Sequence, residues 1–311
     1  MIGGFVIDKP EGITSHDVVA RVRRVTGERR VGHAGTLDPF ATGVLVVCVG
    51  RATRLVQFLV GLDKEYIATI KLGYATDTQD LTGKQITPLR SSNELSLEDV
   101  RRVLERFTGP QLQTPPMFSA KKVAGQKLYV AARAGREVKR EPVRIEVYAL
   151  ELIEEETTLN ANDDGTRDVG VKVRGSSGTY VRTLAHDIGE ALGLGAHLTK
   201  LRRTGVGHFK VDSALTLDEL ERTPRDDLRR MLLSPFLTLQ HLPVIRLDDQ
   251  RIKQVVTGRA FSLSNDERAE VKGDVIPLRL CDEGGALVAV GYYDAPLQVV
   301  RPRVVLAAEV R

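Results

Sequence analysis

Hydrophobic and polar residues alternate with two different periods along this chain, and these periods predict strands and helices in turn. Strict alternation over 64–72 and the apolar runs 5–7 and 44–49 are typical of strands. Apolar residues spaced by three or four positions indicate helices that follow the capping boxes begun by Thr14 and Ser96. The other expected elements are strands at 143–147 and 169–173, joined by an acidic hairpin-like loop, and a helix at 184–192. Helices and strands are therefore expected to mix along most of the chain.

The pattern changes toward the C-terminus. Residues 216–239 predict helical packing, which ends before Pro243. Beyond residue 244 the sequence predicts one helix and short strands, a β-rich module that is small but able to lean on its neighbour. We therefore expect one domain over 1–240 and a second over 244–311.

Composition and charge are those of a folded protein that can accept a polyanion. The chain has 311 residues, 42% of them hydrophobic and 28% charged, with a formal net charge of +4. Residues 21–30 carry five arginines and 117–146 carry eight lysines or arginines, whereas 151–168 carry seven acidic residues. This segregation predicts one face for a phosphate backbone and one turned away from it. Ordinary solvated surfaces would give the same pattern, and charge alone leaves both interpretations open.

The cysteines and the first ten residues help to predict the cellular compartment of the protein. Cys48 and Cys281 are far apart and form no CxxC motif, so we expect neither a structural zinc site nor a disulfide framework. The first ten residues show no basic leader followed by an apolar core, and no window approaches the roughly 18 apolar residues of a membrane span. A cytoplasmic location is the expectation.

The stretch 31–44 sets one acidic side chain, Asp38, on a turn bracketed by Gly35 and Gly43. Pro39 restricts its own backbone and that of Asp38, so the loop should be stiff, as a catalytic carboxylate requires. Asp followed by Pro is also a common helix N-cap and first-turn pair. Taken by itself, the motif leaves both interpretations open.

Two further stretches carry candidate chemistry. Residues 113–144 begin with Pro115-Pro116 and are rich in basic side chains, which suits an arm that closes on RNA, while a basic amphipathic helix over 128–134 is an equal alternative. In the stretch 174–187, Tyr180 and Arg182 are expected on one side of a short extended piece. Arg182 is a candidate partner for a buried carboxylate, although an isolated arginine is more often a surface or ion-pair residue.

Four motifs in this order closely resemble the TruB family of pseudouridine synthases over residues 6 to about 212. The family pattern is carried by the Asp8-Lys9-Pro10 start together with Gly32-His33-Ala34-Gly35-Thr36-Leu37-Asp38-Pro39, Lys64-Glu65-Tyr66, Gly175-Ser176-Ser177-Gly178-Thr179-Tyr180-Val181-Arg182-Thr183 and Leu201-Arg202-Arg203. One departure is Phe118, which stands where many members have tyrosine, so ring stacking is retained and a hydroxyl is lost.

The resemblance implies an α+β fold, with a mixed, largely antiparallel central sheet flanked by helices and a small C-terminal β-rich PUA-like domain. It implies an isomerase that flips the T-loop uridine of tRNA, conventionally position 55, into a pocket and converts it to pseudouridine. That chemistry involves no redox change and needs no metal or cofactor. The arm over 113–144 resembles the bacterial branch, whose members act alone, so the expected partner is tRNA, with no protein partner and a monomeric state.

The resemblance also assigns roles. Asp38 is the essential carboxylate, either as a nucleophile at the sugar or as a base at the 2′ position, Tyr66 stacks on the uracil and helps to remove the C5 proton, and Arg182 keeps Asp38 ionised and oriented. The expected substrate- and RNA-binding residues are His33, Lys9, Tyr180, Leu201 and Phe118, together with the phosphate contacts Arg21, Arg24, Lys121, Lys122 and Arg202.

The sequence also bears on three functions other than that of a synthase acting alone. Relatives of dyskerin type work inside guide-RNA particles, so a guided subunit is one alternative, and an RNA-binding or tRNA-folding module is another. An aspartate-nucleophile phosphatase is excluded on the argument that Asp38-Pro39-Phe40 offers no second carboxylate nearby for magnesium.

Overall fold

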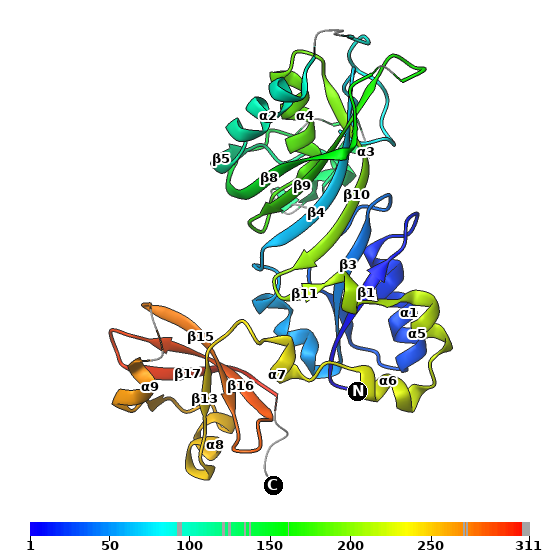
Figure 1. The fold of residues 1–311 in the computed structure, drawn as a ribbon. Coiled ribbons are helices and arrows are strands. Elements are labelled where there is room, and N and C mark those ends of the chain that lie inside the picture. The colour runs from blue at the N-terminus through cyan, green and yellow to red at the C-terminus, as the bar shows by residue number, and fades with distance from the viewer. Residues whose placement is uncertain are drawn as a thin grey trace.

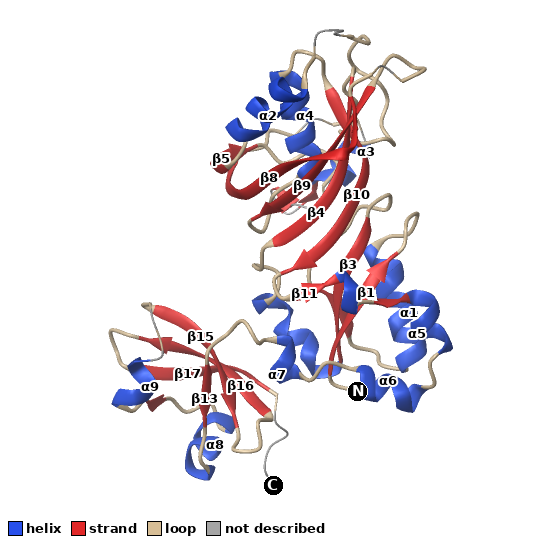
Figure 2. Ribbon diagram, in the orientation of Figure 1, coloured by secondary structure: helices blue, strands red, loops and turns tan. Residues whose placement is uncertain are grey.

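A large twisted sheet with helices packed on it forms most of the molecule, and a smaller β-rich unit lies beside one end (Figure 1). The structure is a computed structural model of the chain. It describes residues 1–91, 95–119, 122–123, 126–133, 135–136, 138–160, 162–269, 271 and 273–306. Figure 2 shows the strands running through the centre of the large part and the helices along its sides.

The large sheet has ten strands in the order β12-β1-β3-β10-β4-β9-β8-β5, with β2 paired to β3 and β11 paired to β10. Among these strands, β1 with β12 and β3 with β10 pair in parallel, and the other pairs are antiparallel. The predicted mixed, largely antiparallel sheet is thus confirmed. The strands are β1 (Gly3–Lys9), β2 (Val31–His33), β3 (Thr42–Val49), β4 (Lys64–Leu72), β5 (Gly109–Gln113), β8 (Val143–Thr158), β9 (Arg167–Gly175), β10 (Ala196–Val206), β11 (Phe209–Lys210) and β12 (Leu215–Thr216).

The helices begin where their capping residues predict. Thr14 and Asp17 form a capping box at α1, Ser96 and Asp99 form one at α2, and Gly27 ends α1 in the left-handed conformation. The α-helices are α1 (Ser15–Thr26), α2 (Leu97–Arg106), α3 (Leu128–Arg133), α4 (Val181–Ala191), α5 (Leu217–Arg222), α6 (Arg225–Met231), α7 (Pro235–Thr238), α8 (Asp249–Val256) and α9 (Asn265–Ala269), with short 3-10 helices at Gly50–Phe58 and Val211–Ser213. No described helix is long and apolar enough to cross a membrane.

Alternation along β4 places one set of its side chains in the main core. Tyr66, Ala68, Ile70 and Leu72 are buried and alternate with half-buried residues over the predicted range of the strand. They share a core with the apolar faces of α2 and α4. Tyr66 is therefore held on the inner side of the sheet, as its position in the alternating pattern predicted.

Two predicted elements differ from the observed ones. The acidic stretch 154–156 is part of β8, which continues to Thr158, because β8 and β9 form a hairpin longer than their apolar alternation indicates. Arg182 lies in the first turn of α4 rather than on an extended piece, because Tyr180 is the N-cap of that helix. The helix thus begins three residues earlier than expected.

The basic segment over 113–144 contains regular structure. Its described residues include the two-stranded ribbon of β6 (Lys122–Val123) and β7 (Gln126–Lys127), followed by α3. Leu128 and Ala131 are buried, which is the behaviour expected of the amphipathic-helix alternative. Lys121 lies outside the described residues, and only the backbone of Lys122 is described.

The C-terminal unit shares a core with the rest of the chain. Its sheet has the order β13-β15-β16-β17-β14. Cys281 and Leu287 from this sheet pack in one apolar cluster with Val46 of β3 and Leu239 after α7, and the guanidinium of Arg54 donates to the carbonyl of Val305 at 2.6 Å. This unit therefore leans on the larger part. Its strands are β13 (Val244–Arg246), β14 (Phe261–Ser262), β15 (Val275–Cys281), β16 (Leu287–Asp294) and β17 (Val299–Val305).

Candidate active site

Asp38 lies on a tight loop between β2 and β3, and its neighbours make that loop rigid. Gly43 has φ +102°, and a Cβ there would lie 2.2 Å from the carbonyl oxygen of Arg203, so the approach of β3 to β10 requires glycine. The Ser15 hydroxyl contacts both the backbone N–H and the carbonyl of Leu37, at 2.9 and 3.2 Å. These contacts hold the loop from both ends, as its predicted stiffness requires.

Lys9 holds the other side of the same loop. Its side chain is fully buried, and Nζ donates to the carbonyls of Pro10, Ile13 and Pro39 at 2.8, 2.8 and 3.2 Å. Burial lowers the pKa of Lys9 to about 8, with the Asp38 carboxylate acting in the opposite direction. Lys9 thus ties the turn before α1 to the residue that follows Asp38.

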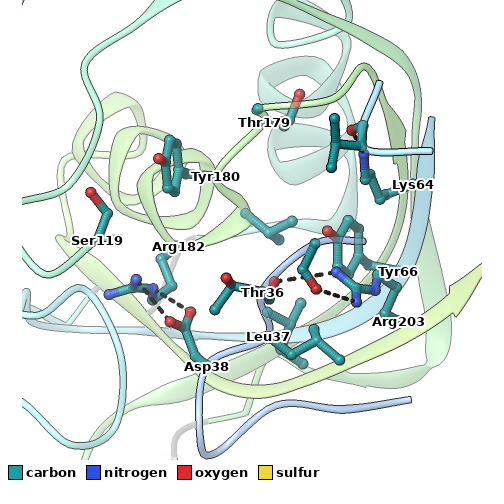
Figure 3. A pocket seen from close by; sticks show the side chains of 15 residues that line it. Thr36, Leu37, Asp38, Lys64, Tyr66, Ser119, Thr179, Tyr180, Arg182 and Arg203 are labelled. Carbon is teal, nitrogen blue, oxygen red and sulfur yellow. Dashed lines mark hydrogen bonds and ion pairs between the residues drawn. The ribbon is translucent and has the colours of Figure 1, made fainter. Parts of the chain in front are cut away.

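The Asp38 carboxylate binds a buried guanidinium (Figure 3). Arg182 Nε lies 2.9 Å from Oδ2 of Asp38, and Nη2 donates to Oδ1 at 3.2 Å. Arg182 is 4% exposed, and it also donates to the carbonyls of Phe118 and Thr78 at 2.8 and 2.9 Å. Because the carboxylate is engaged by Arg182 and not by a backbone N–H at a helix start, the N-cap interpretation of Asp38 is wrong. The bidentate pair with Arg182 fixes the orientation of the Asp38 carboxylate.

Asp80 is a second carboxylate on the same guanidinium, and sequence reasoning missed it. It is 4% exposed, lies 3.4 Å from Nη1 of Arg182, and accepts hydrogen bonds from the hydroxyls of Thr78 and Thr82 at 2.7 and 2.6 Å. The sequence signal that could have marked Asp80 is its loop, in which Thr and Asp side chains can form hydrogen bonds with one another. A phosphatase is excluded above because no second carboxylate is expected near Asp38, and that expectation is wrong. The Arg182 cation, however, lies between the two acids.

Three influences act on the pKa of the Asp38 carboxyl. Burial raises its pKa above the ordinary value of 3.8, Asp80 adds to that rise, and Arg182 opposes it. The side chain is still 32% exposed at the mouth of a cavity. Asp38 is therefore an accessible carboxylate whose basicity is higher than that of a surface aspartate.

A cavity of about 280 Å³ opens beside Asp38, and Figure 3 shows the side chains around it. The predicted residues Tyr66, Tyr180, Arg182 and Leu201 all line it, from β4, α4 and β10. Gln113 holds the backbone of Tyr180 from both sides, with its amide donating to the carbonyl at 3.1 Å and its oxygen accepting from the N–H at 2.8 Å. The cavity is therefore built from residues far apart in the sequence, with Asp38 at one side.

Lys64 and Arg203 also line this cavity, and sequence reasoning missed both. Arg203 is 2% exposed, and its guanidinium donates to the carbonyls of Val44, Thr36 and Gly35 at 2.7, 3.3 and 3.2 Å. Two consecutive arginines in one strand must face opposite sides, and that rule could have marked one of them as inward. Arg203 thus holds the loop that carries Asp38.

A second cavity of about 640 Å³ adjoins the first and shares Asp38, Ser119 and Arg182 with it. Phe118 lines this second cavity, next to the residues that begin α1. His33 lines neither cavity; its ring meets that of His16 edge-on, with centroids 5.4 Å apart. Burial lowers the pKa of His33, and the charges of His16 and Arg203 lower it further. Within the described part of the chain, no three His, Cys, Asp or Glu side chains lie close enough together to hold a metal ion.

The sequence profiles of two domains match consecutive parts of this chain. Residues 23–181 match the N-terminal domain of TruB family pseudouridylate synthases, and 182–242 match the C-terminal domain of tRNA pseudouridylate synthase B. A protein of Geobacter sulfurreducens named tRNA pseudouridine synthase B is 48% identical, over 83% of this chain and 82% of its own length. One of the same name from Geotalea uraniireducens is 42% identical, over 95% and 93%.

This chain belongs to the TruB family.

Solved structures support the TruB assignment at the level of the fold. An archaeal box H/ACA Nop10-Cbf5 complex contains a chain that matches 99% of this one and 87% of its own length, with a TM-score of 0.70 and 26% identity. An H/ACA particle bound to a substrate RNA with 2′-deoxyuridine gives a TM-score of 0.72 at 25% identity, over 99% and 86%. The predicted α+β fold with a small C-terminal β-rich domain is confirmed. Both TruB profiles end at or before residue 242, so this domain lies beyond them.

The surface arginines expected to contact phosphate in this TruB protein are each engaged by an acid. Arg21 and Arg24 lie 3.7 and 2.7 Å from Glu221, and Arg202 lies 2.7 Å from Asp8. Arg202 also lines a groove with Glu155 and Glu156 on the far side of β4 from the core, so basic and acidic residues are not confined to separate faces there. Long side chains in exposed pairs exchange partners at little cost, so these arginines stay available to a polyanion.

Proposed function

We propose that this chain acts alone as a tRNA pseudouridine synthase that converts the T-loop uridine, conventionally position 55, to pseudouridine. The observation that carries the proposal is the buried Arg182 paired with an accessible Asp38, beside a cavity lined by Tyr66 and Leu201. The names of the relatives, which share 37–48% identity with this chain, support tRNA as the substrate.

The cavity accounts for the first step. A uridine cannot be rearranged inside a base stack, so it is flipped out at a cost of a few kcal/mol and its base enters the pocket. Tyr66 from β4 and Leu201 from β10 provide the apolar walls between which a flat ring fits. The ribose then lies toward Asp38. His33 and Phe118 lie outside this cavity and would act on the surrounding RNA loop.

Asp38 then acts at the sugar. It attacks C1′, or it removes the 2′ proton, and either route breaks the bond between C1′ and N1 of the base. Both routes require the carboxylate form, which Arg182 favours and orients through two hydrogen bonds. After the base rotates, C5 bonds to C1′, and the Tyr66 hydroxyl helps to remove the C5 proton. Asp80 acts as a positioning residue by holding Arg182 from the opposite side.

The test is the release of tritium from a T-arm RNA carrying 5-tritiated uridine, with the pure protein and no guide RNA. We expect release by the wild type and a loss of at least about 10⁴-fold in Asp38→Asn, since the amide cannot serve as nucleophile or base. Asp226→Asn is the matched control, because that exposed carboxylate lies on α6 and its ion pair within the described part of the chain is with Arg229, at 3.4 Å.

The outcomes separate the alternatives. The structural likeness to Cbf5 chains favours a guided subunit as the second candidate, and it predicts no release until a guide RNA and partner proteins are added. Release that persists in Asp38→Asn would contradict the role of Asp38. An RNA-binding or tRNA-folding module predicts that Asp38→Asn keeps both RNA affinity and the cellular effect.

We also propose the remaining organisation of this enzyme: a catalytic domain over 1–240, a PUA-like domain over 244–311, a monomeric state and a cytoplasmic location. The basic segment 113–144 would close on the tRNA, with Arg21, Arg24, Lys121, Lys122 and Arg202 as phosphate contacts. The carbonyl of Phe118 on Arg182 supports such closure, because it joins that segment to the catalytic pair.

A further inference from the structure

The 280 Å³ cavity has two ends with different charges. Asp38 and Arg182, with Asp80 behind the guanidinium and outside the lining of this cavity, form what we call the carboxylate end, and Lys64 and Arg203 form the cation end. Figure 3 draws Asp38 and Arg182 on one side of the cavity and Lys64, Tyr66 and Arg203 on the other. The mechanism described above uses the charges of the carboxylate end only.

Neither cation has an acidic partner among the described residues. Lys64 is 8% exposed, and Nζ donates to the carbonyls of Val60, at 2.7 Å, and Leu62. Arg203 is 2% exposed, and its acceptors are the carbonyls of Gly35 and Thr36 in the Asp38 loop and of Val44 in β3. Carbonyl dipoles satisfy the hydrogen bonds of a cation but leave its net charge uncompensated. The cation end therefore holds two buried positive charges.

These two charges act on each other and on the cavity. Burial, together with the charge of Arg203, lowers the pKa of Lys64 to about 8, and the neighbouring Asp63 acts in the opposite direction. Arg203 lowers the pKa of Lys9 and His33 as well, so its field extends across the site. A ligand that carries negative charge would relieve this repulsion, and a neutral ligand would not.

The proposed reaction creates such a charge, and the inference rests on that function. When the bond between C1′ and N1 breaks, its electron pair stays on N1 and the base carries one negative charge, spread over O2 and O4. On the sugar side, either C1′ bonds to an Asp38 oxygen or Asp38 takes the 2′ proton, and the base is the same anion in both routes. When C5 bonds to C1′, the electron pair of the anion forms that bond and the base becomes neutral. On the sugar side, the bond between C1′ and Asp38 breaks, or Asp38 returns its proton to C2′, so the carboxylate is regenerated. The C5 proton then leaves and N1 gains one, which gives pseudouridine.

We propose that the cation end is a uracil-anion subsite, in which Lys64 and Arg203 stabilise the negative charge that appears on the detached base. Tyr66 belongs to the same side of the cavity, so a ring stacked on it lies within the field of both cations. Charge stabilisation of this kind is strongest in a pocket that excludes water and whose groups are held in advance. The carbonyls bound by Lys64 and Arg203 hold them in that way.

The test compares two target bases in T-arm hairpins: uridine and 5-fluorouridine. Fluorine withdraws electrons and stabilises the base anion, so 5-fluorouridine depends less on the protein's cations. The assay is the single-turnover disappearance of the target nucleoside. Lys64→Gln keeps a donor and removes the charge; we expect it to slow uridine roughly 10- to 100-fold and to slow 5-fluorouridine at least about fivefold less. Lys64→Arg keeps the charge and should stay within about threefold of wild type.

A purely structural role for Lys64, tying the loop at 60–62 to β4, gives a different result. Equal slowing of both bases by Lys64→Gln, or Lys64→Arg as slow as Lys64→Gln, would overturn the subsite while wild-type conversion of uridine left the proposed function intact. Wild-type protein that converts neither hairpin would overturn the function and the subsite together. Lys64→Met, which keeps the packing of the stem, replaces Lys64→Gln if the latter fails to fold.

Discussion

The carboxylate end and the cation end of one cavity hold buried charges in opposite ways. At the carboxylate end, Arg182 is shared by Asp38 and Asp80, at 2.9 and 3.4 Å, so each charge has a counter-charge and a fixed direction. At the cation end, the hydrogen-bond acceptors of Lys64 and Arg203 among the described residues are carbonyl oxygens. Paired charges fix geometry while cancelling much of their field, whereas unpaired charges keep their field at a cost in stability. The first arrangement suits a group that must be aimed, and the second suits charge that appears during a reaction.

Apart from the loss of Asp38 itself, the largest effect is expected from removing the shared cation. Arg182→Met leaves the half-buried Asp38 and the buried Asp80 without a counter-ion, so we expect the rate of tritium release to fall at least about 10³-fold and the free energy of unfolding to fall by about 3 kcal/mol. Single-turnover assays and thermal unfolding measure the two. Arg182→Lys keeps the charge without the bidentate geometry and should lose roughly 10²-fold. A fully active Arg182→Met protein would contradict the view that the carboxylate end depends on paired charges to orient Asp38.

Arg203→Met tests the unpaired cation. The carbonyls of Gly35, Thr36 and Val44 lose their donor, so we expect a stability loss of about 2 kcal/mol and a rate loss of roughly 10²-fold on uridine. Because charge is lost as well, 5-fluorouridine should be slowed less than uridine. Arg203→Lys keeps one charge and should retain the wild-type ratio of the two rates. A ratio unchanged in Arg203→Met would leave Arg203 as a support of the loop alone.

The pH dependence of kcat/KM tests how the carboxylate end controls the ionisation of Asp38. Asp38 must be ionised, so kcat/KM falls as pH drops through its pKa, which burial and Asp80 raise above 3.8. Asp80→Asn removes one of these causes, and the acid limb of kcat/KM should therefore move to lower pH, while the rate at neutral pH falls roughly 10-fold because Arg182 loses an acceptor. Profiles between pH 4.5 and 8 on a T-arm RNA measure this. An acid limb that does not move in Asp80→Asn would show that Asp80 does not raise the pKa of Asp38.

The smallest effect is expected outside the cavity. Arg202 is half-buried and pairs with Asp8 at 2.7 Å, so Arg202→Ala should change the free energy of unfolding by no more than about 1 kcal/mol. If it contacts a phosphate, the slope of log Kd for tRNA against log salt should weaken by about one. Filter binding between 50 and 200 mM salt measures the slope. An unchanged slope would show that the pair with Asp8 is the whole role of Arg202.

The sequence predicted much of the site because its motifs name residues directly. Asp38, Tyr66, Tyr180, Arg182 and Leu201 all line the observed cavity. Their chemistry could be assigned only through the resemblance to a family, since an Asp-Pro turn alone did not distinguish a cap from an active-site acid. The pair of Arg202 and Arg203 shows the limit, because the motif predicts a role for Arg202 whereas it is Arg203 that lines the cavity.

By itself, the sequence determined the local features of this protein: the strand Lys64–Leu72, the caps of α1 and α2, and the stiff turn around Asp38. These depend on alternation, on side chains that bond their own backbone, and on glycine conformation, all of which act over a few residues. Only the tertiary structure decided which charges meet. Arg182 reaches Asp38 across 144 positions and Asp80 across 102, and Arg203 reaches Gly35 across 168. Such contacts depend on the register between β3, β10 and β4 and on how α4 packs against that sheet, and no local pattern of residues encodes either.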